Sequence, residues 1–99
     1  MKAPHARMSW LMEYMQNNGP VDILNADFVE AYLAWTEARA IDTNWGARKC
    51  PTLSRDLRYL WAIGRARRGR VGLGFNWQPG FPKWVWSYEP LPKEKAPGG

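Results

Sequence analysis

The chain has 99 residues, 45% of them hydrophobic, and a net charge of +5 at pH 7. This length fits one domain with a modest core, and the hydrophobic content together with seven Trp argues against a disordered regulator. Residues 1–15 contain charged side chains and no uninterrupted apolar run, so they predict neither a secretory signal nor a membrane span. The single Cys excludes a disulfide within the chain and fits a reducing compartment. We therefore expect a cytoplasmic protein, nucleoid-associated or in a host cytoplasm.

Charge is divided unevenly between the two halves of the chain. Residues 1–46 carry three basic and six acidic side chains, whereas residues 47–99 carry eleven basic and three acidic ones. Such segregation creates a one-sided positive field, which attracts a polyanion because binding releases condensed counterions. A basic face without any partner is the alternative interpretation, and we favour a nucleic-acid partner.

Two helices are predicted in the acidic half. Apolar residues at helical spacing predict the first over residues 5–17, followed by Gly19 and Pro20, which favour an exit from the helix. Asn25 is a good N-cap for the second helix, which continues to about residue 39. Residues 21–24, between the two helices, are a candidate short strand that would pair with a hairpin near the C-terminus.

A third helix is predicted in the basic half. Residues 40–50 have no steady period and are expected to form a loop. Pro51 suits the first position of a helix over residues 51–63, and Gly64 ends it. Its predicted buried stripe consists of Leu53, Leu57, Leu60 and Trp61.

The sequence then changes to the pattern of a β-hairpin. Residues 70–75 alternate and residues 84–88 are rich in strand-forming side chains, with a loop-like segment between them. Residues 89–99 are rich in Pro, Lys and Gly and predict a mobile tail. We therefore expect one domain over residues 1–88.

Helix, short strand, helix, helix, strand, loop and strand is the element order of a winged helix. The chain resembles the winged helix-turn-helix superfamily in residues 51–64 (PTLSRDLRYLWAIG) and in residues 65–70 with the aromatic hairpin after them. The resemblance covers roughly residues 5–88 and implies an α+β fold of three helices and a C-terminal β-hairpin wing. It also implies a double-stranded DNA partner and a small transcriptional or architectural regulator, with the helix at residues 51–63 in the major groove.

The third helix offers a polar face opposite its apolar stripe. A helical projection places Arg55, Arg58, Tyr59 and Ala62 on that face, and arginine can donate two parallel hydrogen bonds to guanine or phosphate. The resemblance implies base contacts from Thr52, Ser54, Arg55, Arg58 and Tyr59. A solvated face is the alternative, with Asp56 close enough to pair with an arginine and lower the local charge.

Phosphate contacts are expected on both sides of this helix. Arg48 and Lys49 precede it, beside an N-terminus whose amides favour anions. Four arginines crowd the predicted turn into the hairpin: Arg65, Arg67, Arg68 and Arg70. We favour phosphate contact for this run, and a solvated turn is the alternative. In the resemblance, the wing would contact DNA through Lys83.

The hairpin is unusually aromatic. Trp77 and Gln78 lie at the expected tip of the wing. Trp84, Trp86 and Tyr88 alternate along the second strand, so they share one face of the sheet. This face could be a stacking platform for unpaired bases, but we favour its packing against the helices as core.

Catalysis, a metal site and a cofactor are not expected. One Cys and one His do not make a metal site without a group of carboxylates, Gly72 and Gly74 are not followed by a phosphate-loop signature, and Cys50 has no partner His.

Two other classes of function stay open. One is a winged-helix protein-interaction module, for example a phage-encoded modulator of a host protein, and the other is a single-stranded nucleic-acid binder that uses the hairpin aromatics. The small size suits a phage or mobile-element regulator, and a homodimer is among the open oligomeric states.

Overall fold

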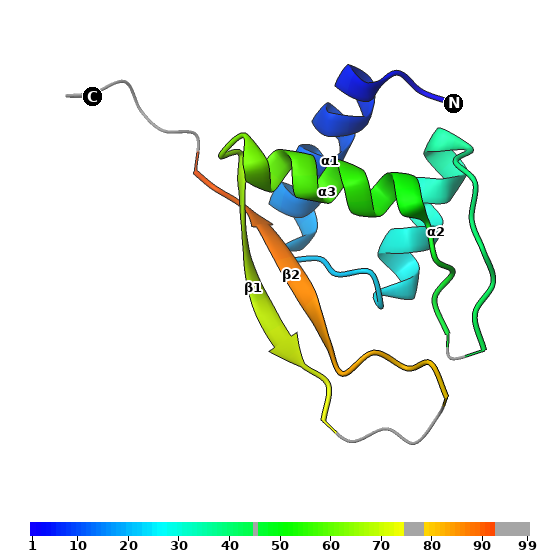
Figure 1. Ribbon diagram of the computed structural model, residues 1–99. Helices are drawn as coiled ribbons and strands as arrows, with labels where there is room; N and C mark the ends of the chain where they lie inside the picture. The colour runs from blue at the N-terminus through cyan, green and yellow to red at the C-terminus, as the bar shows by residue number, and fades with distance from the viewer. Residues whose placement is uncertain (45, 75–78, 93–99) are drawn as a thin grey trace.

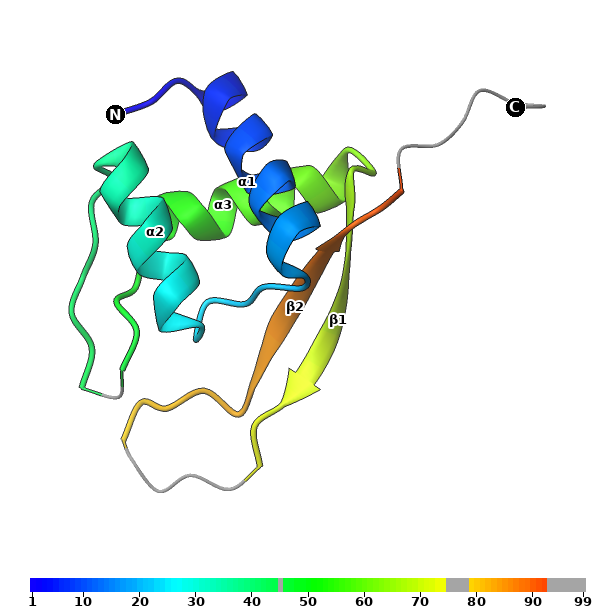
Figure 2. The ribbon, with the colours of Figure 1, turned by 180° about the vertical axis from the view of Figure 1, so that it is seen from behind.

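Three helices followed by a β-hairpin form the computed structural model, which describes residues 1–44, 46–74 and 79–92 (Figure 1). The elements are α1 (Pro4–Asn18), α2 (Ala26–Thr36), α3 (Pro51–Ala62), β1 (Ala66–Gly72) and β2 (Trp84–Pro90). The predicted α+β class, with three helices and a C-terminal hairpin, is confirmed. In Figure 1, α3 crosses the near side of the molecule, and Figure 2 shows α1 and α2 on the opposite side. Each of the described helices is too short or too polar to cross a bilayer.

The helices begin where local capping signals are placed. Pro4 lies at the start of α1 and Pro51 at the start of α3. Proline suits these positions because the first N–H groups of a helix have no partner within it. The Asn25 side chain caps α2 by accepting a hydrogen bond from the Phe28 N–H at 3.2 Å. At the end of α1, Gly19 adopts a φ of 86°, a conformation that favours glycine. These signals explain why the predicted helix starts agree closely with the structure.

The second helix ends earlier than predicted, at Thr36. The Thr36 hydroxyl donates to the Tyr32 carbonyl oxygen at 2.7 Å and accepts from the Ala38 N–H at 3.2 Å. Glu37 then takes a left-handed φ of 58°. These bonds to the threonine side chain offer the backbone an alternative to the next helical turn, so the apolar pattern continues beyond the helix itself.

Residues 40–44 and 46–50, the described part of the predicted loop, contain one pair of bridging residues. Ile41 and Lys49 exchange two backbone hydrogen bonds of 2.8 Å. The bridge holds the two ends of the loop together immediately before α3.

The hairpin starts earlier than predicted. β1 and β2 pair antiparallel in a regular register that runs from Ala66 opposite Pro90 to Gly72 opposite Trp84. The prediction of a turn at residues 65–70 is therefore wrong for residues 66–69, which belong to β1, whereas Arg70 lies in a strand as predicted. The strand β2 also includes Glu89 and Pro90, which the sequence assigned to the tail, while residues 93–99 lie outside the described ranges.

The candidate strand at residues 21–24 is reduced to one bridging residue. Val21 exchanges two backbone hydrogen bonds of 2.8 Å with Tyr88 of β2. The predicted pairing with the hairpin is thus present at Val21, and the chain turns away immediately afterwards because a turn follows at residues 23–24.

The core lies between the three helices and the near end of the hairpin. Fully buried side chains from all three helices include Leu11, Phe28, Tyr32, Leu53, Leu57 and Leu60. The predicted stripe of α3 is confirmed for its leucines, but Trp61 is 41% exposed. Trp61 lies at the edge of the stripe, where its ring packs against an arginine of β1 instead of entering the core.

A buried polar cluster links the helices. The Arg7 guanidinium of α1 donates two hydrogen bonds to the Asp56 carboxylate of α3 at 2.8 and 3.2 Å, and the Tyr32 hydroxyl of α2 donates a third at 2.6 Å. The hydrogen bond with Asp56 is the main cause of a raised pKa of Arg7. Burial, followed by the bond to Asp56, raises the pKa of Tyr32 well above its usual value. The cluster fixes the rotation of α3 about its axis, since Asp56 must face inward.

Candidate nucleic-acid interface

The outward face of α3 carries the predicted base-contacting residues. Ser54, Arg55, Arg58 and Tyr59 are exposed, with Tyr59 at 54% of its full accessibility, and Thr52 is half-buried. In the described part of the chain, Arg55 and Arg58 have no side-chain hydrogen bond or ion pair. Asp56 does pair with an arginine, but the partner is Arg7 and not an arginine of α3. The two outward guanidinium groups therefore keep their full charge and their donors.

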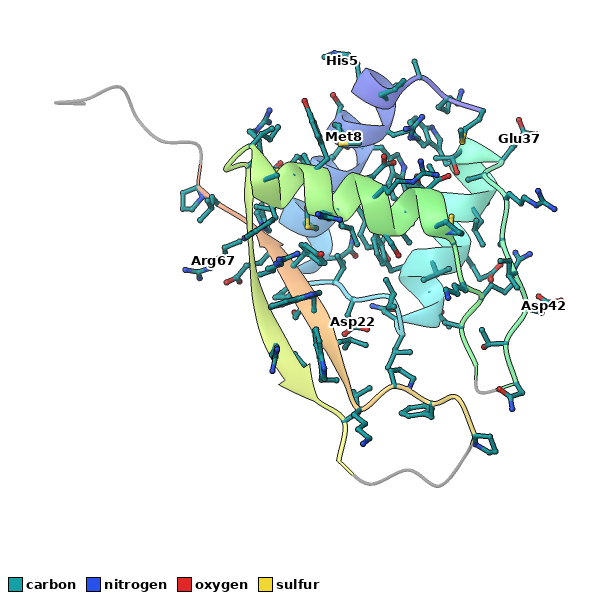
Figure 3. All side chains as sticks on the ribbon, viewed as in Figure 1. His5, Met8, Asp22, Glu37, Asp42 and Arg67 are labelled. Carbon is teal, nitrogen blue, oxygen red and sulfur yellow. The ribbon has the colours of Figure 1, made fainter. Side chains whose placement is uncertain are left out.

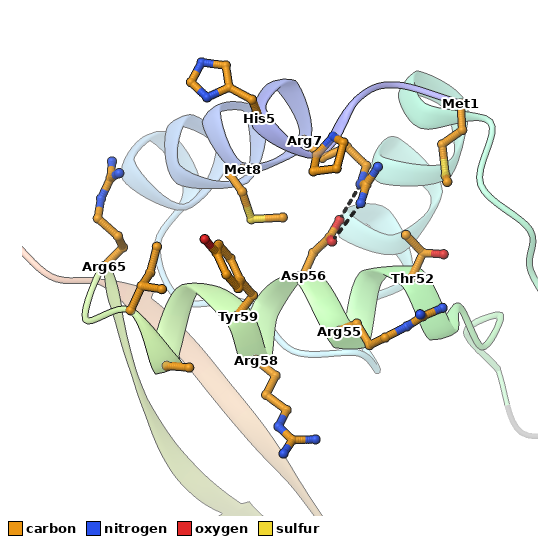
Figure 4. A pocket seen from close by; sticks show the side chains of 13 residues that line it. Met1, His5, Arg7, Met8, Thr52, Arg55, Asp56, Arg58, Tyr59 and Arg65 are labelled. Atoms are coloured by element: carbon orange, nitrogen blue, oxygen red, sulfur yellow. Dashed lines mark hydrogen bonds and ion pairs between the residues drawn. The ribbon is translucent and has the colours of Figure 1, made fainter.

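A groove of about 860 Å³ runs along one flank of this face, between α3 and the first turns of α1. Figure 4 shows Tyr59 and Met8 facing each other across it, with the ion pair of Arg7 and Asp56 between the helices. Arg58 leaves α3 on the side away from α1, towards the side on which the hairpin runs. The polar face of α3 is thus bordered by the groove on one side and by the hairpin on the other.

The two basic residues before α3 differ in their environment. The Arg48 guanidinium donates to both carboxylate oxygens of Glu30 in α2, at 2.9 and 2.6 Å. This hydrogen-bonded pair raises the pKa of Arg48 and lowers the pKa of Glu30. Lys49 is exposed and has no such partner among the described residues. Of the predicted phosphate seat, only Lys49 carries a charge that is not locally compensated.

The arginines of β1 lie on two different faces of the sheet. Arg67 points to one face, where it forms an ion pair with Glu89, the residue directly opposite on β2. Figure 3 shows Arg67 directed away from the helices. Arg68 and Arg70 point to the other face, the face that also carries Trp84, Trp86 and Tyr88. Arg65 precedes the strand and is exposed. The crowded arginines of the sequence are therefore separated by the alternation of the strand.

Arg68 and Arg70 are interleaved with tryptophan rings. The Arg68 guanidinium lies 3.6 Å from the ring centre of Trp61 and 4.1 Å from that of Trp86. The Arg70 guanidinium lies 4.4 Å from the ring centre of Trp84 and 5.9 Å from that of Trp86. We call these five residues (Trp61, Arg68, Trp86, Arg70 and Trp84) the tryptophan–arginine ladder. It runs from the end of α3 along the hairpin.

Burial falls steadily along this face of the hairpin. Tyr88 is buried beside the helices, Trp86 is half-buried, and Trp84 is 39% exposed. The prediction that these three aromatics pack as core is thus confirmed for Tyr88 and wrong for Trp84. The difference arises because the hairpin extends beyond the helices, so that only its near end has helices to pack against.

The predicted wing residues are only partly placed. Trp77 and Gln78 lie outside the described residues. Lys83 is exposed, and its carbonyl oxygen accepts a hydrogen bond from the Leu73 N–H at 3.0 Å. This bond places Lys83 at the base of the loop, where the strands end, and not at a projecting tip.

The charges of the basic half are strongly one-sided after pairing. Over residues 46–74 and 79–92, the acidic residues are Asp56 and Glu89, and each is engaged by an arginine. The basic side chains with neither a hydrogen bond nor an ion pair in these ranges are Lys49, Arg55, Arg58, Arg65, Arg68, Arg70 and Lys83. These residues form a cationic surface over α3 and the hairpin.

Metal-binding side chains are not gathered in the described part of the chain, where no group of three or more His, Cys, Asp or Glu could hold an ion. Cys50 is buried at the start of α3. No protein-family model, curated protein or solved structure matches the chain. Functional inference therefore depends on the residues themselves.

Two features of the site were missed from the sequence. The first is the inward position of Arg7, which the sequence placed in an amphipathic helix without a special role. The signal for it was Asp56, an acidic residue among the buried leucines of α3 that needs a basic partner. For the ladder, the signal was the alternation of Arg68 and Arg70 with the same period as Trp84 and Trp86, which predicts facing rows once both segments are strands.

Proposed function

We propose that the protein binds double-stranded DNA as a small transcriptional or architectural regulator, with α3 in the major groove. One observation supports this proposal above the others. Helix α3 turns Arg55 and Arg58 outward without acidic partners in the described part of the chain, while its single acid, Asp56, is turned inward onto Arg7. A helix whose only negative charge is buried and neutralised presents a purely cationic face to a polyanion.

The second element of the proposal is the hairpin. The arginines of the hairpin that have no acidic partner among the described residues lie on the face that continues from the end of α3, so α3 and β1 can contact the same duplex. In this arrangement Arg55 and Arg58 contact base edges, and Arg65, Arg68, Arg70, Lys49 and Lys83 contact phosphates. The winged-helix resemblance is consistent with this division, and we extend the proposal to a cytoplasmic location, in which buried Cys50 stays reduced.

Fluorescence anisotropy with a labelled random-sequence duplex, and with a single strand of the same length, tests the proposal. We expect the protein to prefer the duplex, and its affinity to fall steeply as salt rises, because each phosphate contact releases counterions. Absence of duplex binding at low salt would contradict the proposal.

Exposed apolar residues favour a protein partner as the second candidate. Tyr59, Trp61 and Ile63 are 54%, 41% and 48% exposed on neighbouring turns at the end of α3, and Trp and Tyr are enriched at the centres of protein interfaces. Under this alternative, Tyr59→Ala and Ile63→Ala would weaken partner binding, and the binding that remains would keep the salt dependence of the wild type.

A further inference from the structure

We propose that the tryptophan–arginine ladder is a preorganised phosphate-binding strip. In this proposal Arg68 and Arg70 each contact a backbone phosphate of the bound duplex, and the indole rings position the two guanidinium groups without stacking on bases. The inference rests on the proposed function and deepens it, because it assigns the backbone contacts of the hairpin to one face of β1.

The guanidinium groups of Arg68 and Arg70 lie against tryptophan rings. Arg68 lies between the rings of Trp61 and Trp86, with 3.6 and 4.1 Å to the ring centres. A planar guanidinium held against a ring has its faces covered, while its N–H donors lie along its edge. Neither Arg68 nor Arg70 has a side-chain acceptor among the described residues, so these donors are available to an anion.

Contacts with the rings lower the entropic cost of ordering the two arginine side chains on binding. A free arginine side chain loses considerable rotamer entropy when it is immobilised by a ligand. Contacts with Trp61, Trp86 and Trp84 have already restricted Arg68 and Arg70 in the unbound protein. Preorganisation of this kind increases affinity because less freedom is lost on binding.

The spacing of the two arginines along β1 also fits a phosphate backbone. Arg68 and Arg70 are two positions apart on one strand, so they lie on the same face about 6.6 Å apart. Trp61 lies at the end of α3, one helical turn after Arg58, so the strip begins beside the base-contacting face. Two cations at this spacing next to that face suit a ligand with repeating phosphates better than a single small anion.

The same contacts argue against base stacking. The Trp86 ring is contacted by Arg68, by Arg70 and by the Trp84 ring, whose centre is 5.0 Å away. A base could cover the face of Trp86 that Arg68 occupies only after displacing that guanidinium. Trp86 is therefore not a free stacking platform. The charged donors of the ladder belong to its arginines, and these fit the phosphate backbone.

The test compares three arginine substitutions on β1 in duplex binding across a salt series. Arg68→Ala and Arg70→Ala should each reduce the slope of log affinity against log salt by about 0.9, the contribution of one phosphate contact. Arg67→Ala is the matched control, since it removes the same charge from the same strand on the opposite face, and it should leave the slope unchanged. Equal slopes for all three variants, with wild-type duplex binding intact, would overturn the ladder proposal and leave the proposed function standing.

A second set of variants separates position from charge. Arg68→Lys and Arg70→Lys retain the charge but not the planar group, and Trp86→Leu retains both arginines. Each should weaken duplex binding by about threefold to tenfold with an unchanged salt slope, because the charge remains and only the ordering is lost. Unchanged affinity in these variants would overturn the positioning role of the rings.

Two further measurements show whether a negative result contradicts the proposed function or only the role of the ladder. In NMR spectra of the free protein, the Arg68 and Arg70 Nε–H signals should be shifted by the neighbouring rings relative to Arg67, and Trp86→Leu should reduce these shifts. If the shifts are present but the wild-type protein does not bind a duplex at low salt, the proposed function fails and the phosphate assignment fails with it. A preference for single strands that Trp86→Leu abolishes would overturn the inference in favour of base stacking.

Discussion

The Asp56 carboxylate on α3 accepts two hydrogen bonds from the guanidinium of Arg7 on α1, a residue 49 positions earlier in the chain. Both residues are buried, with 5% of the accessible surface of Asp56 and 9% of that of Arg7 exposed. Removal of one partner leaves a buried charge without compensation, which is more costly than the net contribution of the pair itself. The bond therefore ties the presentation of the cationic face to the stability of the helical core.

Asp56→Ala should lower the free energy of unfolding by about 3–5 kcal/mol, since Arg7 and the Tyr32 hydroxyl both lose their acceptor. Urea denaturation followed by circular dichroism measures the change. Glu13→Ala, at an exposed position on α1, is the control and should change stability by less than about 0.5 kcal/mol. A loss in Asp56→Ala no larger than in the control would show that the cluster does not hold the helices together.

The raised pKa of Tyr32 should make the folded protein less stable at alkaline pH. Burial raises the pKa of the folded-state phenol above its ordinary value of 10.0, so above pH 10 the unfolded chain releases a proton that the folded chain retains. The stabilisation is complete below pH 10 and decreases at higher pH by up to about 1.4 kcal/mol per pH unit. Denaturant titrations between pH 9 and about pH 12 should show this extra decrease in the wild type and in the surface control Tyr59→Phe, but not in Tyr32→Phe. An equally steep decrease in Tyr32→Phe would contradict it.

Glu30 should restrain DNA binding by occupying Arg48. The two side chains are exposed and joined by two hydrogen bonds. Glu30→Gln removes the negative charge and frees the guanidinium beside the start of α3, so we expect tighter duplex binding at low salt and a steeper salt slope, by about 0.9. Glu13→Gln makes the same change of charge on α1 and serves as the control. If the two variants bind equally well, Arg48 does not contribute to the interface.

Helix positions were predictable from the sequence because their signals are local. The Asn25 side chain caps a helix start by accepting a backbone hydrogen bond within the first turn. The prolines at residues 4 and 51 mark helix starts because the N–H that they lack has no partner in the first turn. The apolar stripe of Leu53, Leu57 and Leu60 likewise follows from spacing alone. These features fixed the order of elements, and with it the expected side of α3 that faces outward.

Tertiary contacts explain what the sequence did not show. The segment containing Arg68 and Arg70 has the composition of a turn, but its backbone pairs with β2 along its whole length, and its guanidinium groups pack on tryptophans from α3 and β2. Trp61 was assigned to the core because it is large and apolar, whereas the partner that holds it at the surface lies on β1. Such pairings depend on which segments meet in space, and neither spacing nor propensity encodes that directly.

Binding of duplex DNA by Arg55 and Arg58 is tested most directly by anisotropy of a labelled duplex across a salt series. The variant Arg55→Ala/Arg58→Ala is compared with Lys2→Ala/Arg39→Ala, which removes the same charge from the acidic half of the chain. We predict steeply salt-dependent binding for the wild type and for the control, and at least about tenfold weaker binding for Arg55→Ala/Arg58→Ala. Equal affinities of the two double variants, or no binding by the wild type at low salt, would contradict the account.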